Sequence, residues 1–246
     1  MRNPDAWRPS KYVREKGRLR ASRNPADVGV SSRLIVDLVA AWYEVNLKAH
    51  ARGRLLDLGC GKVPLFAEYR DLVTENVCVD WAKSHGSTYL DLEHDLNEKL
   101  PFDSGAFDTI ILSDVLEHTP EPQALCQEMA RVLSPGGKLL LNVPFFYWIH
   151  EAPYDFCRYT EFALRRFMEK SGLRLLQIES IGGVPEVLAD IFGKSAAEYV
   201  PLVGAGLASF TQWTAAGFIR TPLGRKMSNA TRQTFPLGIC LVAEKV

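Results

Sequence analysis

The 246-residue sequence lacks the cysteine pattern of a disulfide-stapled or cysteine-ligated zinc protein. Its five cysteines are scattered, odd in number and form no Cys-x-x-Cys pair, which predicts reduced thiols. The first residues are polar and basic without an apolar core, so we expect no signal peptide. Together these absences predict a cytoplasmic protein.

The glycine-rich stretch of the chain lacks two signatures of phosphate binding. It reads Leu-Leu-Asp-Leu-Gly-Cys-Gly over 55–61 and continues Lys-Val-Pro-Leu-Phe. There is no third glycine, as a dinucleotide fingerprint requires, and no Gly-Lys-Ser/Thr ending, as a triphosphate loop requires. We therefore expect a ligand that carries adenosine but no phosphates, and a nucleotide-sugar oxidoreductase is disfavoured.

What is present is a glycine turn followed at a distance by an acid. A short apolar run ends in Asp57 and Leu58, and Gly59 and Gly61 follow, where glycine allows positive φ and close approach to a ligand. Nineteen residues past Gly61, the apolar run 77–79 ends in Asp80. An acid at the tip of the second strand of a βαβ unit is placed to accept hydrogen bonds from a ribose diol.

The net charge is zero, but its distribution is uneven. Residues 1–25 carry eight Lys or Arg side chains against two acidic ones. This run is either a solvated, mobile terminus or, with Trp7 and Tyr12 in it, a lid that orders over the cofactor. It could also attract an anionic substrate or a membrane surface. No nucleic-acid partner is expected, because a sequence pI near 7.0 gives no broad basic footprint.

Alternating elements predict an α/β protein with a doubly wound parallel sheet. Ser31 or Ser32 can cap a helix that continues to about Lys48. Strands are expected at 54–58, 76–80, 88–91, 107–112 and 138–143, with helices at 64–72 and 122–133. Ligands of such sheets bind at the carboxyl ends of the strands, near which Asp57, Asp80, Asp114 and Asn142 lie.

Five segments in the same order resemble the class I S-adenosylmethionine-dependent methyltransferases, over about residues 52–182. They are 55–61 (LLDLGCG), 91–96 with 100–102, 107–118 (FDTIILSDVLEH), 131–138 (RVLSPGGK) and 139–144 (LLLNVP). The resemblance implies a Rossmann-like, seven-stranded, mostly parallel sheet and S-adenosylmethionine as the cofactor.

The resemblance also implies roles for particular residues. Asp57, Gly59 and Gly61 would hold the methionine end of the cofactor, and Asp80, with Trp81 beside it, the ribose. Asp95 and Leu96 would hold the adenine. Ser113 and Asp114 would line the donor pocket beneath the transferable methyl group.

A loop after the strand at 138–143 is the expected acceptor site. Its segment 150–160 reads His-Glu-Ala-Pro-Tyr-Asp-Phe-Cys-Arg-Tyr-Thr, and similar HExPxDxxRYT segments occur in a bacterial methyltransferase subgroup often associated with surface-glycan pathways. Thr160 is expected to cap a helix over 161–171. The candidate catalytic residues are His150 and Asp155.

Each of these loop residues also has a purely structural interpretation. His150 is a general base for an acceptor hydroxyl, or it pairs with Glu151 or Asp155 to brace the loop. Arg158 holds an anionic acceptor group, or it bridges Asp155. Tyr154 and Tyr159 stack on a sugar or ring, or they only pack. The candidate substrate-binding residues are His118, Glu151, Tyr154, Arg158 and Tyr159.

Asp114, Glu117 and His118 stand at i, i+3 and i+4, a metal-ligand spacing if a helix begins there. The alternative is pocket lining and helix capping, and we expect no metal.

The C-terminal third carries an insertion. Strands are expected at 173–181 and 235–243, which in the related fold are joined by a short turn, and here about fifty residues intervene. Residues 199–219 hold no charged side chain, but their glycines and Pro201 argue against a membrane span. A helical cap over the active site is favoured. A dimer face or peripheral membrane contact, supported by the flanking basic residues Arg220, Arg225, Lys226 and Arg232, is the alternative.

These observations predict three parts: a basic extension and helix over 1–50 as a candidate lid, a methyltransferase core over 51–182 and 233–246, and an apolar helical cap over 183–232. The predicted function is S-adenosylmethionine-dependent methyl transfer to a small-molecule or glycan-like, anionic or lipid-linked acceptor, with a slight preference for oxygen. A non-catalytic binding or scaffold protein is the alternative. The oligomeric state is left open, and the predicted location is cytoplasmic, with contact at the inner membrane face as a second option.

Overall fold

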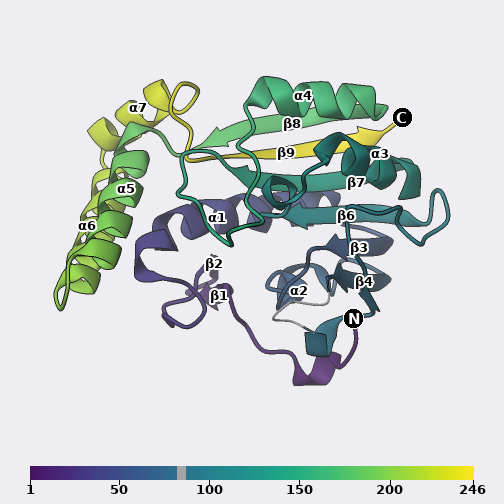
Figure 1. Ribbon diagram of the computed structural model, residues 1–246, viewed down its shortest axis with the longest axis horizontal. Helices are drawn as coiled ribbons and strands as arrows, with labels where there is room; N and C mark the ends of the chain where they lie inside the picture. The colour runs from purple at the N-terminus through teal and green to yellow at the C-terminus, as the bar shows by residue number, and fades with distance from the viewer. Residues whose placement is uncertain (82–86) are drawn as a thin grey trace.

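A seven-stranded sheet forms the centre of the computed structural model, which describes residues 1–81 and 87–246 (Figure 1). The strand order is β5-β4-β3-β6-β7-β9-β8, and β9 runs antiparallel to both of its neighbours while the other pairs are parallel. The strands are β3 (Arg54–Leu58), β4 (Glu75–Asp80), β5 (Leu92–Glu93), β6 (Phe107–Ser113), β7 (Leu133–Pro144), β8 (Leu173–Ile181) and β9 (Gly238–Lys245). The predicted doubly wound, mostly parallel sheet is confirmed.

Helices cover both faces of this sheet, because its central strands are apolar on both sides. Leu55 of β3 belongs to one buried cluster, with α1 (Arg33–His50) and α2 (Phe66–Tyr69). Its neighbour Leu56 belongs to the other, with α3 (Pro122–Val132) and α4 (Glu161–Lys170). The predicted cap of α4 is present, since Thr160 Oγ1 accepts a hydrogen bond from the Ala163 N–H at 3.2 Å.

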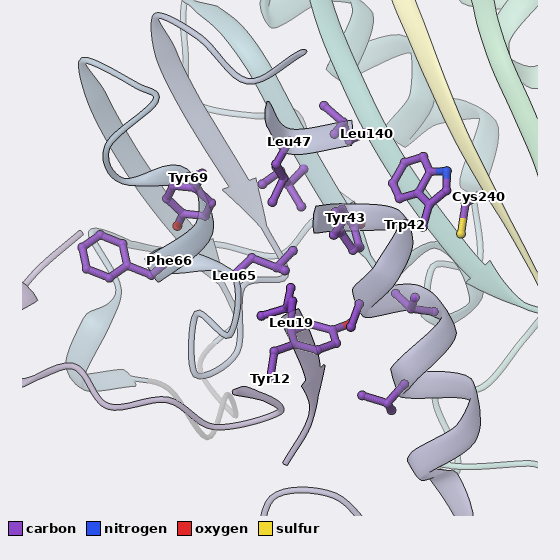
Figure 2. Packing of buried hydrophobic residues seen from close by; sticks show 14 of the residues in the cluster. Tyr12, Leu19, Trp42, Tyr43, Leu47, Leu65, Phe66, Tyr69, Leu140 and Cys240 are labelled. Carbon is purple, nitrogen blue, oxygen red and sulfur yellow. The ribbon is translucent and has the colours of Figure 1, made fainter. Parts of the chain in front are cut away.

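The N-terminal segment contains a β-hairpin that the sequence analysis did not anticipate. Strands β1 (Tyr12–Glu15) and β2 (Arg18–Ala21) pair antiparallel, and η1 (Pro4–Ala6) precedes them. Tyr12 and Leu19 point into the first buried cluster, against α1 and Leu65 (Figure 2). Trp7 Nε1 donates to the Val63 carbonyl at 3.0 Å, so the segment is tied to the loop after β3.

Several predicted boundaries differ from the structure. The helix expected at 64–72 is a single turn, and the strand expected at 88–91 lies at β5, after η3 (Ser87–Tyr89). Asp91 Oδ2 accepts the Cys78 N–H at 2.8 Å, so this N–H of β4 is bonded by a side chain and not by the backbone carbonyl of a neighbouring strand. Ser32 occupies the cap position of α1 after η2 (Val30–Ser32), but its hydroxyl contacts the Tyr147 hydroxyl at 3.0 Å rather than a helix N–H.

The insertion forms α5 (Val184–Tyr199), α6 (Gly204–Phe218) and α7 (Pro222–Thr231), which project from one end of the sheet (Figure 1). It packs beside the start of α1, where Gln212 Oε1 accepts the Leu34 N–H at 2.9 Å. Lys194 of α5 pairs with Asp190 at 2.5 Å and lies 3.2 Å from the centre of the Tyr147 ring. Across the described residues, none of the helices has the length and apolar character needed to cross a bilayer.

Candidate active site

A cavity of about 1140 Å³ opens at the carboxyl ends of the central strands. Its position next to β3 and β6 is where the strand order reverses, the usual ligand site of a doubly wound sheet. Eight of the nine residues expected at the cofactor line it: Gly59, Gly61, Asp80, Trp81, Asp95, Leu96, Ser113 and Asp114.

The glycine loop is held in a backbone shape that needs glycine. Gly59 has φ of 66°, and a Cβ there would lie 2.3 Å from Val115 Cγ2. Asp80 ties this loop to β4, because its Oδ2 accepts the Gly61 N–H at 2.7 Å and its Oδ1 accepts the Trp81 N–H at 2.8 Å. The loop and the acid nineteen residues later form one unit.

Asp57 is the exception among the expected cofactor residues. It lies outside the cavity lining and is 4% exposed, and the Tyr69 hydroxyl donates to its Oδ2 at 3.1 Å. Burial raises its pKa to about 7. The structure therefore places Asp57 outside the cavity lining, bonded to Tyr69, and its contact with the methionine end of the cofactor stays a prediction.

Asp114 connects three distant segments at the cavity wall. Its backbone has φ of 54°, its Oδ1 accepts a hydrogen bond from Asn142 Nδ2 at 2.6 Å, and its Oδ2 pairs with Lys11 Nζ at 2.5 Å. Burial lowers the pKa of Lys11, but the charge and hydrogen bond of Asp114, together with Tyr12 and Tyr147, outweigh this and hold that pKa above its ordinary value. The sequence analysis missed Lys11 as an individual residue, although it belongs to the basic N-terminal run.

The spacing argument for Asp114, Glu117 and His118 fails, because the chain forms the 3₁₀ turn η4 (Leu116–His118) and not an α-helix. The structure instead brings His150 to Glu117 and His118. Glu117 Oε1 lies 3.7 Å from His118 Nε2 and 3.9 Å from His150 Nε2. All three residues line the cavity.

Glu117 is fully buried, and neither of its carboxylate oxygens has a hydrogen-bond partner among the described residues. Burial raises the pKa of its carboxyl well above the ordinary value, and the Asp114 charge adds to this. Burial also lowers the pKa of His150, and His118 lowers it further.

Each imidazole ring has a contact at its Nδ1 atom. His118 Nδ1 lies 2.9 Å from the Tyr154 carbonyl oxygen, which can only accept, so Nδ1 carries the proton. His150 Nδ1 lies 3.2 Å from Asp155 Oδ2, and the same oxygen accepts the His150 backbone N–H at 2.9 Å. His118 Nε2 consequently presents a lone pair to the cluster, whereas His150 Nδ1 makes no hydrogen bond among the described residues.

Arg158, Asp155 and Tyr159 make their contacts within the loop and with the residues next to it. Arg158 donates to both oxygens of Asp155, at 2.5 and 2.8 Å, and to the Trp148 carbonyl at 2.9 Å. Tyr159 is 5% exposed and donates to the Leu116 carbonyl at 3.0 Å. None of these three lines the cavity. These contacts are those of the bracing and packing alternatives, substrate binding by Arg158 and Tyr159 stays untested, and Asp155 contacts His150 from outside the cavity lining.

Glu151 and Tyr154 do line the cavity, and the Tyr154 ring meets Trp81 edge-on with ring centres 4.9 Å apart. The described lining residues include none from 183–232. Ser10, Lys11, Ala26 and Asp27 of the N-terminal segment line it. The helical insertion stands beside the site, where the sequence analysis expected a cap over it.

A family model described as a methyltransferase domain matches residues 32–178. The chain belongs to this methyltransferase family. The class I fold of this family implies S-adenosylmethionine as the cofactor.

Relatives and solved structures agree with this assignment. The chain is 31% identical over 154 residues to a ubiquinone biosynthesis O-methyltransferase of Coxiella burnetii, a match that covers 52% of this chain and 66% of that protein. An S-adenosylmethionine-dependent methyltransferase of Archaeoglobus fulgidus has a TM-score of 0.55 at 16% identity, covering 83% of this chain and 93% of that one. Geranyl diphosphate C-methyltransferase of Streptomyces coelicolor has a TM-score of 0.54 at 13% identity, and the match covers 88% of this chain and 84% of that one. These two structures share the fold.

Proposed function

We propose that this methyltransferase transfers the methyl group of S-adenosylmethionine to a hydroxyl oxygen of a small acceptor. The observation that carries the proposal is the cluster of Glu117, His118 and His150 in the same cavity as the glycine loop and Asp80. A hydroxyl loses its proton as it is methylated, and this cluster is suited to assist that loss. The Coxiella burnetii relative, named as an O-methyltransferase, supports the same choice of atom.

The donor half of the proposal assigns one role to each part of the cofactor-side lining. Gly59 and Gly61 approach the methionine end, and Asp80, which already orders the loop, accepts the ribose hydroxyls, with Trp81 beside it. Asp95 and Leu96 flank the adenine. Ser113 and Asp114 lie beneath the transferable methyl group.

Little further chemistry is required of the protein. The sulfonium is already a strong electrophile, so the site has to align the acceptor oxygen with the methyl carbon and exclude water, which can supply several kcal/mol. Glu151 and Tyr154 are placed to contact the acceptor because they line the cavity on the loop that carries His150.

The donor and acceptor halves are tested separately. Calorimetric titration with S-adenosylmethionine should show Asp80→Ala weakening the affinity by about 1–3 kcal/mol, from a charge-assisted contact left unpaired. His150→Ala should keep that affinity and lower turnover by roughly 100-fold on an acceptor found by screening phenols, sugars and lipid-linked alcohols. Folded wild-type protein that binds no S-adenosylmethionine would refute the function, and binding without transfer to any acceptor would favour the scaffold alternative.

A membrane-borne, lipid-linked acceptor is the finer form of this proposal, and the insertion supports it. Phe210 and Trp213 of α6 are 62% and 72% exposed, and Leu202 before α6 is fully exposed. Between 199 and 235 the chain has four basic residues and no acidic one, while exposed Glu198 at the end of α5 precedes this stretch. Exposed aromatic side chains beside Arg and Lys suit an anionic bilayer surface.

Vesicle sedimentation tests this form. The protein should bind phosphatidylglycerol-containing vesicles more tightly than pure phosphatidylcholine ones, and Phe210→Ser with Trp213→Ser should reduce that binding by roughly 10-fold or more. Phe162→Ser on α4, an aromatic residue 76% exposed outside the insertion, is the matched control. Equal binding by all variants, or a dimer lost in the double variant, would remove the bilayer as the occupant of this face.

A further inference from the structure

Three potential metal-ligating atoms face one another at the acceptor side of the cavity. Nε2 of His118 and Nε2 of His150 lie 3.7 and 3.9 Å from Glu117 Oε1, and one ligating atom from each residue lies within 4.8 Å of the other two. Glu117 is fully buried without a hydrogen-bond donor for either oxygen in the described part of the chain. A buried carboxylate without a partner is costly, which calls for an explanation.

The orientation of the two rings sharpens the question. The Tyr154 carbonyl accepts the His118 Nδ1–H at 2.9 Å, which leaves His118 Nε2 as an acceptor that faces Glu117. The Asp155 carboxylate lies 3.2 Å from His150 Nδ1 and accepts the His150 backbone N–H, so it holds this residue in place, although Nδ1 itself makes no hydrogen bond among the described residues. A histidine fixed through Nδ1 by a carbonyl or carboxylate, with Nε2 left for a cation, is the usual outer support of a metal ligand.

We propose that Glu117, His118 and His150 bind a divalent transition-metal ion of the Zn²⁺ type. Two imidazole nitrogens and one carboxylate oxygen favour such an ion over Mg²⁺ or Ca²⁺, which take oxygen ligands. The two separations from Glu117 Oε1, 3.7 and 3.9 Å, exceed by a few tenths of an ångström the roughly 3.4 Å expected between ligands of a tetrahedral ion with 2.0–2.1 Å bonds, and the whole set lies within 4.8 Å. Binding of the ion would draw the two imidazole rings and the carboxylate closer together.

This assignment departs from the sequence-based expectation of no metal and from the Asp114-Glu117-His118 spacing. Asp114 is occupied by Lys11 and Asn142, at 2.5 and 2.6 Å, and does not join the cluster. His150 takes its place from a loop thirty-two residues beyond His118. Three protein ligands leave the remaining position of the ion to the cavity, since all three residues line it.

The inference rests on the proposed function and specifies how the acceptor is activated. The acceptor's hydroxyl oxygen binds the ion at the open position and releases its proton to water. That oxygen then attacks the methyl carbon, the carbon–sulfur bond breaks, and its electron pair remains on sulfur. The products are the methyl ether, S-adenosylhomocysteine and the released proton. His150 is then a ligand, and Asp155 is a positioning residue that acts through it.

The test uses the full-length protein stripped with a chelator and dialysed. Zn²⁺ should bind stoichiometrically in calorimetry, and Co²⁺ in its place should give visible absorption bands typical of nitrogen-ligated, low-coordinate cobalt. Glu117→Gln and His118→Asn should abolish the bands, and Asp155→Asn should weaken Zn²⁺ binding by about 10–100-fold. Glu151→Gln, a carboxylate next to His150 that is not a proposed ligand, should bind the metals as the wild type does.

S-adenosylmethionine affinity is measured on the same samples, which separates the two proposals. Wild-type protein that binds the cofactor but neither metal overturns the metal site and leaves His150 as the direct proton acceptor. Metal binding unchanged in Glu117→Gln and His118→Asn also overturns it, because the ion would then lie elsewhere, for example on cysteines. Wild-type protein that does not bind S-adenosylmethionine would instead refute the proposed function.

Discussion

The donor and acceptor sides of the cavity are built in different ways. The donor side comes from consecutive strand ends, with Gly59, Gly61 and Asp80 within a single βαβ unit and joined by the Gly61–Asp80 hydrogen bond of 2.7 Å. The proposed acceptor side is assembled from Glu117, His118 and His150, which come from a 3₁₀ turn and from a loop more than thirty residues further along the chain. Local geometry defines the first, and tertiary packing defines the second.

The largest effect is expected from Gly59→Ala, which tests whether local backbone geometry defines the donor side. Positive φ costs a non-glycine residue about 1–2 kcal/mol, and crowding against Val115 adds about 1–3 kcal/mol. The combined cost should appear partly as a lower free energy of unfolding, measured by thermal unfolding. The rest should appear as a loss of S-adenosylmethionine affinity of roughly 10-fold or more, measured by calorimetry.

Gly17→Ala is the matched control for that change. Gly17 has φ of 77° in the β1–β2 turn, but a Cβ there meets nothing within 4 Å. It should lose stability without losing cofactor affinity. Equal loss of affinity in both variants would mean that the donor side is no more locally defined than the hairpin.

A second prediction concerns Asp57, which precedes the glycine loop, and the dependence of the free energy of unfolding on pH. Because burial raises the pKa of Asp57 from 3.8 to about 7, its carboxyl is protonated in the fold and ionised in the unfolded chain between these values. The unfolded state then binds fewer protons, so the free energy of unfolding falls as pH rises across this range and levels off above it.

Asp57→Asn keeps an acceptor for the Tyr69 hydroxyl and cannot ionise. Its free energy of unfolding should therefore gain on that of the wild type by about 1 kcal/mol per pH unit from pH 4 to 7, in urea titrations at each pH. A difference that does not change with pH would show that Asp57 is ionised in the fold.

The smallest of these effects is expected where the N-terminal segment meets the cavity wall. Lys11→Met removes the partner of Asp114 and should lower the free energy of unfolding by about 1–2 kcal/mol, with faster hydrogen exchange in β1 and β2. Lys16→Met, in the exposed hairpin turn, is the control and should change neither. If both variants behave alike, the Lys11–Asp114 pair does not hold the N-terminal segment against the site.

The same contrast explains which parts of the site could be predicted from the sequence. The sheet, the glycine loop and Asp80 follow from short motifs whose spacing fixes their geometry. The Asp114-Glu117-His118 hypothesis assumed a helix, but Asp114 has φ of 54° and the chain turns away from helical spacing. Nothing in a residue pattern reports that angle, nor that the returning loop would place His150 beside Glu117.

The aromatic loop shows a second limit. Tyr154 and Tyr159 are alike in the sequence, yet one lines the cavity and the other donates to the Leu116 carbonyl inside the core. Their directions depend on how α4 and the Arg158–Asp155 pair fold the loop back on itself. The hairpin of the N-terminal segment was missed for a similar reason, because its charge run concealed the inward positions of Tyr12 and Leu19.

The stacking of Lys194 on Tyr147 joins the insertion to the chemistry. The Tyr147 ring lies 3.2 Å from the Lys194 nitrogen on one side, and its centre lies 5.1 Å from that of the His150 ring. The insertion therefore contacts the segment that carries His150 through Tyr147, and a change at Lys194 is felt one ring away from that histidine.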